Sequence, residues 1–368
     1  MNNTAAPASD KHDYDLKEEM RLAQTSKRKT CMRHCKRFWW IYLIAFVCIV
    51  VLVVCLVIFV AVPNIAQDKI NDAELEVVSI AVSQTQSESY TLEINSIIHS
   101  DGSTSATIDP FDGVIYLEDL EPHTPFVRVH FPQTSAAERQ EITLREDVHI
   151  EDMDAFTTFT TWVVNNETLR LTVEGKTRVK TSGLSRKYDV DFKKTVEVAG
   201  FNKLRGAEIV EEESRISLAA QEGEPNFRGV AVIPNPSVIS LDIGNVTFSN
   251  SVGATAVGSL SIDDLQLLPG NNTVNVSAVM DQITLIGLAS SPEFCEDGTL
   301  PFTLRGDTVV NHGQSLSYFA DALASADITV NVDVATLAQE SLNITLSCPG
   351  EGGGLDLPSL LGGLLGQG

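Results

Sequence analysis

The hydrophobic pattern of this chain has two parts, an uninterrupted apolar run near its start and a long region of alternation after it. Residues 38–62 read FWWIYLIAFVCIVVLVVCLVIFVAV, without a charge or a proline. At about 1.5 Å per residue, a helix of this length crosses a bilayer core of about 30 Å. The run leads to Pro63 rather than to a small-residue cleavage site, which favours an uncleaved signal anchor over a removed signal peptide.

The charges beside the run predict its orientation. Six Lys and Arg residues lie between positions 27 and 37, directly before the run. Positive charge near a spanning helix stays on the cytosolic side, and aromatic residues mark the headgroup level. The aromatic residues at the start of the run are Phe38, Trp39, Trp40 and Tyr42. We therefore expect residues 1–37 to form a cytosolic, basic and largely disordered tail, residues 38–62 to span the membrane, and the remainder to be lumenal or extracellular.

Beyond the anchor the dominant period is two, which is typical of half-buried strands. In LRLTVEG, starting at Leu169, apolar residues occupy every second position, and ITVNVDV, starting at Ile328, repeats this pattern. The same alternation in LNITLSC predicts a strand over 342–348 that points Cys348 inward. Along VISLDIGNVTF the apolar parity switches at Gly244, which predicts a β-bulge there.

Two short segments have helical spacing instead, and their positions suggest a duplication. Phe156, Phe159 and Val163 follow Asp152 and Asp154, either of which is a candidate capping acid. A second set, offset by 160 residues, consists of Leu316, Phe319 and Leu323 behind Ser315. A strong strand follows each helix, as expected for a degenerate internal repeat.

The predicted fold class is mainly β, with two tandem sandwich modules that each include a short helix. Many short strands separated by turn signals favour antiparallel sandwiches over a parallel α/β fold. The first module covers 68–205 and the second 226–348. An acidic linker at 206–225, which is compatible with a short helix, joins them. A Gly/Leu-rich tail follows at 349–368.

Charge and cysteine content restrict the partners and the compartment. Residues 1–37 hold nine Lys and Arg against five Asp and Glu, whereas the rest holds 17 against 44, a net charge of −27. Such a region repels phosphate backbones, so nucleic acid is not an expected ligand. Only Cys295 and Cys348 lie beyond the anchor. An oxidising lumen predicts a disulfide between them, and two buried thiols are the alternative. Cys31 and Cys35 are candidates for palmitoylation.

Glycosylation sequons beyond the anchor support the same topology. Each has the Asn-x-Ser/Thr pattern, and several fall on the solvent-facing parity of predicted strands. The five candidate glycan sites are Asn166, Asn245, Asn271, Asn275 and Asn343.

Three local motifs carry a resemblance to a known family. They are the Asn235-Pro236-Ser237 turn, the strand that ends at Gly244, and the segment from Leu267 to Asn271 that enters the next strand. With the basic tail and single helix, the chain resembles, over most of 27–348, a fungal membrane-anchored family of uncharacterised function. Its ectodomains are related to late-embryogenesis-abundant, water-stress type β-sandwiches. The first module lacks a clear Asn-Pro turn. The resemblance implies fibronectin-like sandwiches, a vacuolar membrane location, no catalytic residues, and lipid handling in an apolar groove between sheets.

No motif for catalysis, phosphate binding or metal ligation occurs in the sequence. We therefore expect no enzyme activity, cofactor or metal, although carboxylates scattered through loops would not be recognised in this way. The leading hypothesis is a membrane glycoprotein that binds lipid or another apolar ligand close to the bilayer. The alternatives are an adaptor or tether that contacts a lumenal protein and signals through the cytosolic tail, and a purely structural role. The expected location is the vacuolar membrane, with another endomembrane or the plasma membrane as the alternative.

Overall fold

The computed structural model describes residues 39–102, 106–136, 138–182, 185–218, 220–221, 223–346 and 348. Within these residues one helix, Trp39–Asp72, is long and apolar enough to cross a membrane. By its contacts the chain divides into two units, Met1–Ile65 and Ala66–Gly368. The predicted cytosolic tail and the Gly/Leu-rich tail lie outside the described residues.

The apolar helix extends past the predicted end at Val62. It includes the π-helical turn η1 (Val57–Ala61) and continues as α2 (Val62–Asp72), with Pro63 in the first turn of α2. Proline has no N–H to donate, and its ring displaces the carbonyl four residues earlier. A π-turn directly before Pro63 accommodates this loss without ending the helix. Proline at this position therefore modifies the helix rather than stopping it.

The C-terminal turns of α2 belong to the second unit. Ala66 and Ile70 are buried, and the Gln67 side chain bonds the backbone of Asp191 in both directions, at 2.8 and 2.9 Å. The Lys194 ammonium donates to the carbonyl of Asn71 at 2.9 Å and also to that of Ala73. These contacts join the end of the helix to strand β9 (Lys187–Ala199).

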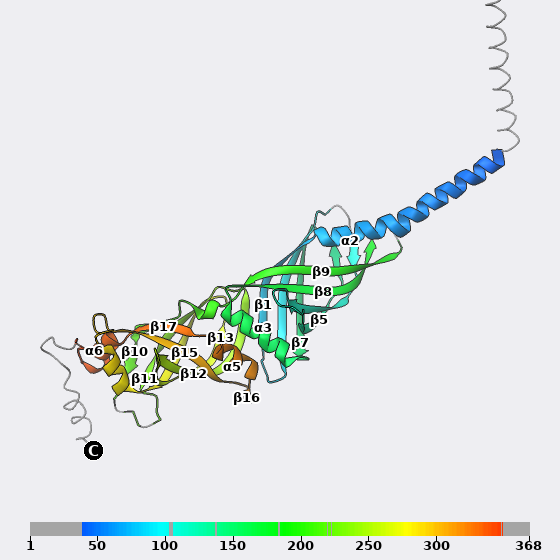
Figure 1. Cartoon of the computed structure of the whole chain (residues 1–368). Helices are drawn as coiled ribbons and strands as arrows, with labels where there is room; N and C mark the ends of the chain where they lie inside the picture. Colours follow the sequence, from blue (N-terminus) through cyan, green and yellow to red (C-terminus); the bar gives the residue numbers. More distant parts are fainter. Residues whose placement is uncertain are drawn as a thin grey trace, which may run out of the picture. The chain divides into compact units, whose positions relative to one another are not determined.

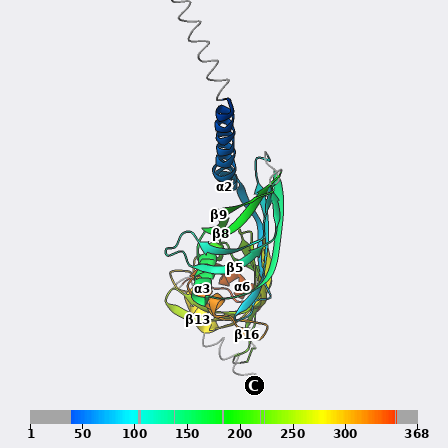
Figure 2. The ribbon, with the colours of Figure 1, turned by 90° about the vertical axis from the view of Figure 1, so that its right-hand side faces the viewer.

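Most strands of the second unit belong to one 11-stranded sheet within the described residues, and Figures 1 and 2 show it from two sides. Its main path is β10-β11-β14-β13-β12-β1-β2-β7, and β15 pairs with β12, β16 and β17. The bounds of these strands are β1 Glu74–Ser83, β2 Ser89–His99, β7 Arg139–His149, β10 Glu208–Ile216, β11 Phe227–Asn235, β12 Ile239–Val252, β13 Thr255–Leu267, β14 Gly270–Met280, β15 Thr299–Asn311, β16 Gln314–Ser315 and β17 Ile328–Asp333.

A 6-stranded sheet within the described residues covers one face of the N-terminal half, residues 74–199. Its order is β5-β4-β8-β3-β6, and β9 pairs with β8. The bounds of its remaining strands are β3 Ala106–Ile108, β4 Phe111–Leu117, β5 Pro125–Phe131, β6 Thr134–Ala136 and β8 Thr168–Thr181. Side chains of β1, β2 and β7 line the same small cavity as side chains of β4, β8 and β9. The two sheets therefore face each other as a sandwich, in agreement with the predicted fold class.

The C-terminal half, residues 208–342, curls into a partly closed barrel. Seven strands follow each other in the order β10-β11-β14-β13-β12-β15-β17, and β10 and β17 at the two ends are in contact without a ladder between them. Helix α6 (Val334–Leu342) directly follows β17 and contacts β10. The helix α4 (Gln282–Ala289) precedes β15, and the 3-10 turn η2 (Asn202–Leu204) precedes β10.

The two predicted helices and the predicted bulge are confirmed. Helix α3 (Met153–Asn165) begins after Asp152, whose carboxylate accepts the N–H of Ala155 at 2.9 Å. Helix α5 (Ser317–Ala324) has no side-chain cap and packs against α3. The pairing register of β12 shifts on both sides of Gly244, which has a φ of +88°. A left-handed conformation is accessible to glycine without steric cost, so the bulge forms there.

Two other sequence expectations are wrong. The predicted acidic linker contains strand β10, which pairs with β11, and β1 pairs in parallel with β12, so both halves share one sheet. The strand predicted over 342–348 is absent from the described part of that segment, because α6 continues to Leu342 and residues 343–346 have no regular structure. Asp333 caps α6 by accepting the N–H of Thr336 at 2.8 Å, and Asn343 ends the helix in a left-handed conformation. The cap at Asp333 and the left-handed turn at Asn343 therefore determine the structure here, and the apolar alternation does not form a strand.

A candidate apolar ligand site in the C-terminal half

The barrel of the C-terminal half surrounds a partly open cavity of about 110 Å³. Seven strands, η2, α4 and α6 contribute to its wall, and almost all of the wall atoms are apolar. The principal apolar lining residues are Leu204, Ile209, Ile216, Phe227, Ala231, Ile233, Phe248, Leu260, Ile262, Val276, Ala278, Met280, Leu285, Phe302, Leu304, Ile328, Val330, Val332, Val334 and Leu337. The cavity therefore occupies the place where the core of this half would otherwise close.

The strand period explains why these residues meet. Along β14, Val276 and Ala278 are buried, whereas Asn271 and Asn275 face solvent, as the sequence predicted. Each strand of the curled sheet directs one such apolar row to the inside. Ala278 lies opposite Phe227 in the ladder, and its single methyl group leaves space beside the ring. Small residues on a concave sheet face thus leave a hollow that larger ones would fill.

The volume of the cavity determines what it holds. An apolar cavity of about 150 Å³ holds a benzene-sized molecule, while sites for drug-sized ligands measure about 300–1,000 Å³. The cavity of about 110 Å³ therefore suits a short hydrocarbon segment, such as the end of a chain, with the remainder of a longer ligand outside.

The polar side chains in the wall differ in how many of their hydrogen-bonding groups have a partner. The amide of Asn226 donates to the Met280 carbonyl at 2.7 Å and accepts the Met280 N–H at 2.9 Å. Gln282 donates to the Ser217 carbonyl at 3.0 Å. Asn250 is different, because only its Nδ2 has a partner, the Met280 sulfur at 3.4 Å, and its Oδ1 has none in the described part of the chain. Asn250 is therefore a buried amide whose oxygen has no hydrogen-bond partner among the described residues.

Helices α4 and α6 border the cavity, and each begins with a capping aspartate. Asp281 caps α4, and bonds from the Thr284 hydroxyl at 2.7 Å and the Thr284 N–H at 3.0 Å hold the pKa of Asp281 below its ordinary value. Leu285 of α4 and Leu337 of α6 line the cavity, while Ile283 of α4 is exposed. The helices thus form a capped, apolar border to the hollow.

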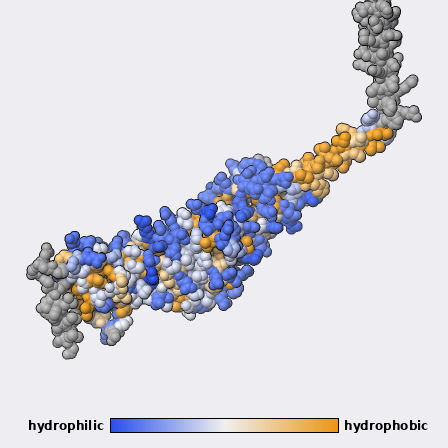
Figure 3. Space-filling view, in the orientation of Figure 1, coloured by the Kyte–Doolittle hydropathy of each residue, from blue (hydrophilic) through white to orange (hydrophobic). Residues whose placement is uncertain are grey.

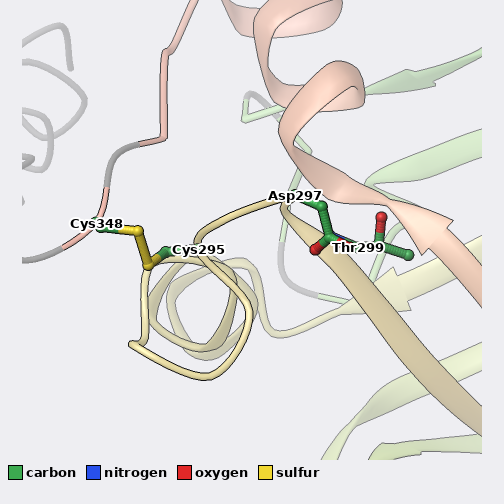
Figure 4. Close-up of a disulfide and its surroundings, with 4 residues drawn as sticks. All are labelled: Cys295, Asp297, Thr299 and Cys348. Carbon is green, nitrogen blue, oxygen red and sulfur yellow. A yellow bond between two sulfur atoms is a disulfide. The ribbon is translucent and has the colours of Figure 1, made fainter.

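The disulfide ties together the chain segments that follow these two helices (Figure 4). Cys295 follows α4 and Cys348 follows α6, and their Cα atoms are 5.0 Å apart. In the same segment the Asp297 carboxylate accepts the N–H of Thr299 at 3.1 Å, at the start of β15. The covalent bond therefore restricts the separation of the two segments that border the cavity.

Side-chain contacts join helix α6, which follows β17, to strand β10. The Ser341 hydroxyl of α6 accepts the N–H of Ile216 at 3.1 Å, and Arg215 lies 3.8 Å from the Glu340 carboxylate. Both partners of the ion pair are exposed, so its contribution is small. Figure 3 shows hydrophobic residues on the surface at the end of the unit where α6, β10 and β11 lie.

The structure places the predicted glycan sites at different exposures. Asn245, Asn271, Asn275 and Asn343 are exposed, and Asn166 is half-buried with its amide donating to the Trp162 carbonyl at 3.2 Å. None of the five lines the cavity. Cys31 and Cys35 lie outside the described residues. Among the residues that the structure describes, no group of three His, Cys, Asp or Glu side chains is arranged to hold a metal ion.

Asn250 was not predicted from the sequence, although its position in the strand pattern is a signal. In the second half of β12 the buried parity runs through Val246, Phe248 and Val252, and Asn250 occupies the same row. A polar residue on the buried, apolar face of a strand is unusual, since buried amides need hydrogen-bond partners. The parity switch at Gly244 identifies which row is inside.

Comparisons with known proteins give a limited result. The model of a family described as a protein of unknown function (DUF3712) matches residues 124–250, which extend from β5 into β12 and cross the predicted module boundary. No curated protein matches the chain.

Solved structures give weak similarities. A protein from Archaeoglobus fulgidus is 10% identical at a TM-score of 0.22, with 34% of this chain and 97% of that chain covered. Red sea bream transglutaminase is 12% identical at a TM-score of 0.23, with coverage of 70% and 30%. A bacterial adhesin from Mobiluncus mulieris is 10% identical at 0.18, with coverage of 64% and 80%. At such TM-scores these similarities carry no argument about this chain.

Proposed function

We propose that this chain is a non-enzymatic, single-pass type II membrane protein whose exported unit binds a lipid chain or another apolar ligand. The observation that carries the proposal is the hollow of about 110 Å³ inside the C-terminal half, with walls that are almost entirely apolar. A core that served stability alone would be filled, because protein interiors pack as densely as organic crystals. An apolar hollow stays dry and takes up apolar molecules.

The helix Trp39–Asp72 supports the membrane part of the proposal. Apart from the half-buried Ile58, its large side chains between Trp39 and Val60 are exposed, and such a surface is stable in lipid rather than in water. The anchor keeps the binding unit at a bilayer, which is the source of the apolar ligand. Four exposed sequons make this unit a glycoprotein in our proposal, and the resemblance to fungal water-stress type sandwiches suggests the vacuolar membrane.

Photolabelling tests the proposal on the full chain. The protein is reconstituted in phosphatidylcholine vesicles that contain a fatty acid with a diazirine in its acyl chain. It is then irradiated and analysed by peptide mass spectrometry. We expect label on peptides of β12 or β14 in addition to the apolar helix, which serves as the internal positive control.

A matched pair of variants locates the label. Ala278→Leu fills the hollow and should remove label from the folded unit while the helix keeps it, because Ala278 is only 2% exposed and lines the wall. Ala256→Leu makes the same chemical change on an exposed position of β13 and should keep both. Label confined to the helix in the unsubstituted protein contradicts the proposal, as does label that survives Ala278→Leu.

A further inference from the structure

The hollow has an opening beside the end of β10 and the start of α4. Most of the lining side chains are buried, but Ile216, Phe227 and Gln282 are half-exposed. These three positions lie together, because Ile216 is opposite Phe227 in the β10–β11 ladder and Gln282 donates to the Ser217 carbonyl at 3.0 Å. Apolar wall atoms are therefore accessible here, and an apolar group that covers them stabilises the protein in water.

The chain that follows α6 is fixed beside this opening. The Ser341 hydroxyl of α6 accepts the N–H of Ile216 at 3.1 Å. Beyond α6 the chain turns back, and the Thr345 hydroxyl donates to a side chain of that helix at 2.8 Å. Cys348 follows closely and is held by the disulfide (Figure 4). The Gly/Leu-rich tail, residues 349–368, therefore starts near the opening.

The tail carries apolar side chains that can reach the opening. Residues 349–368 contain six leucines and no Lys or Arg. Seven residues of chain span at most about 23 Å, at about 3.3 Å per residue. Ser341 lies seven residues before Cys348, and Leu355, the first leucine of the tail, lies seven residues after it. Each leucine of the tail therefore has enough chain to return to the contact between Ser341 and Ile216.

A leucine side chain matches the hollow in size and in chemistry. Truncation of one buried leucine to alanine leaves an apolar cavity of about 150 Å³ in a packed core, and the hollow here measures about 110 Å³. Attachment at Cys348 also gives the tail a local concentration on the order of millimolar at the opening. A free apolar ligand has to compete with that concentration.

We propose that, in the absence of ligand, a leucine of the tail occupies the opening of the hollow, so that an apolar ligand has to displace the tail. This inference rests on the proposed function and adds the regulation of the same site. The docked leucine packs against lining residues such as Ile216 and Phe227. A ligand therefore binds more weakly to the whole chain than to a chain with a polar tail.

Two variants of the full chain test the inference. The apolar variant has isoleucine at all six leucine positions of the tail, which keeps the number of carbon atoms. Both variants keep Cys348 and the disulfide, and each protein is placed in phosphatidylcholine nanodiscs at one copy per disc, which excludes the tail of a second copy. The polar variant carries Leu355→Ser, Leu357→Ser, Leu360→Ser, Leu361→Ser, Leu364→Ser and Leu365→Ser.

The first measurement is made without ligand. Methyl-¹³C methionine gives reporters at only five positions, and Met280 lines the cavity. Met153, at the start of α3 in the N-terminal half, is the internal control. We expect the Met280 signal to move in the polar variant, because the hollow loses its occupant, and to stay close to its original position in the apolar variant. The Met153 signal should be unchanged in both.

The second measurement is a titration with the diazirine fatty acid. A tail that covers the hollow in about four of five molecules weakens the apparent affinity about fivefold. Label on peptides of β12 or β14 should therefore reach half-saturation at an about fivefold lower concentration in the polar variant than in the unsubstituted protein. The apolar variant should match the unsubstituted protein. Partition of the probe into lipid is the same for all three proteins.

The contrary outcomes separate the two proposals. If the folded unit is labelled with equal half-saturation in all three proteins and the Met280 signal does not move, the inference is wrong while apolar binding stands. If the apolar variant behaves like the polar one, burial of a tail side chain is not the cause, and the inference is also wrong. If the Met280 signal moves in the polar variant but none of the three proteins is labelled in the folded unit, the tail docks and the proposed function is wrong.

Discussion

Both halves of the folded unit are built from strands with alternating apolar and polar residues, but their interiors are filled to different extents. The N-terminal half faces two sheets against each other and leaves a cavity of about 50 Å³, and the C-terminal half curls one sheet and leaves about 110 Å³. In the N-terminal half aromatic rings fill the space: Phe111 stacks on Phe131 at 5.0 Å and Phe126 on Phe159 at 4.0 Å. The C-terminal wall is mainly aliphatic, with alanines beside its rings.

This difference distinguishes a filled core that contributes stability from a hollow core that has space for a ligand. Stacked rings add contact energy beyond the area they bury, so the N-terminal half gains rigidity. Aliphatic side chains around a hollow lose contacts on one side. The C-terminal half compensates with a disulfide and two capped helices at its border. We therefore expect the N-terminal half to support stability and the C-terminal half to support binding.

The largest expected loss of stability comes from removing an aromatic ring from the core of the N-terminal half. Phe159→Ala should lower the free energy of unfolding by about 4 kcal/mol, because Phe159 is 4% exposed and its ring stacks on Phe126. Phe302→Ala, at the wall of the existing hollow, should cost about 3 kcal/mol, since that ring already lacks neighbours on one side. Urea titrations of the full chain in nanodiscs, followed by circular dichroism, measure both. A larger loss of unfolding free energy in Phe302→Ala than in Phe159→Ala would contradict the proposed difference between the two halves.

The disulfide is the next test, because within the described residues it lies in the C-terminal half. Replacing Cys295 and Cys348 by serine should cost about 2–4 kcal/mol, since the bond closes a sequence separation of 53 residues. The same urea titration measures the loss, and adding a reductant to the unsubstituted protein should reproduce it. Cys48→Ser with Cys55→Ser, both exposed positions on the apolar helix, is the matched control. An unchanged midpoint after reduction argues against a stabilising role.

Adding carbon atoms to the interior should cost more stability in the N-terminal half than in the C-terminal half. A Cβ on Gly175 would lie 2.7 Å from the Phe111 ring, so Gly175→Ala should cost about 1–3 kcal/mol by overpacking. Ala278→Leu adds three carbons to the hollow and should cost less than Gly175→Ala. Thermal unfolding of the two variants side by side gives the order. A costlier Ala278→Leu means that the C-terminal interior is already full.

The smallest expected effect concerns the cap of α4. Asp281→Ala should cost about 1 kcal/mol, whereas Asp281→Asn keeps a capping side chain without a titrating group. The pKa of Asp281 is lowered by its bonds from Thr284, so the ionised form stabilises the fold at pH above its ordinary value. This contribution disappears as pH falls through the lowered pKa. The stability difference between the unsubstituted protein and Asp281→Asn should therefore be constant from pH 7 to pH 5 and diminish towards pH 2. A stability difference that increases as the pH falls would contradict this prediction.

Local patterns in the sequence determined the elements with strong end signals or a clear period. The helical spacing behind Asp152, the alternation of β8 and β17, and the bulge at Gly244 depend on residues close together in the chain, and the structure contains all of them. The pairing of Cys295 with Cys348 needed only their number and an oxidising compartment, and the structure bonds them. The helix, the strands and the bulge are set by backbone sterics and side-chain period, whereas the disulfide follows from the presence of only two cysteines beyond the anchor.

Only the tertiary structure decided which strands meet and how well they fill the interior. A period of two shows which face of a strand is buried and not which strand lies beside it, so the β10–β11 ladder and the parallel β1–β12 pair were not foreseen. In 342–348 the same period was overruled by the cap of α6 and the turn at Asn343. The hollow beside Asn250 is a small difference between the volume the strands enclose and the volume their side chains occupy, and both depend on the curvature of the sheet.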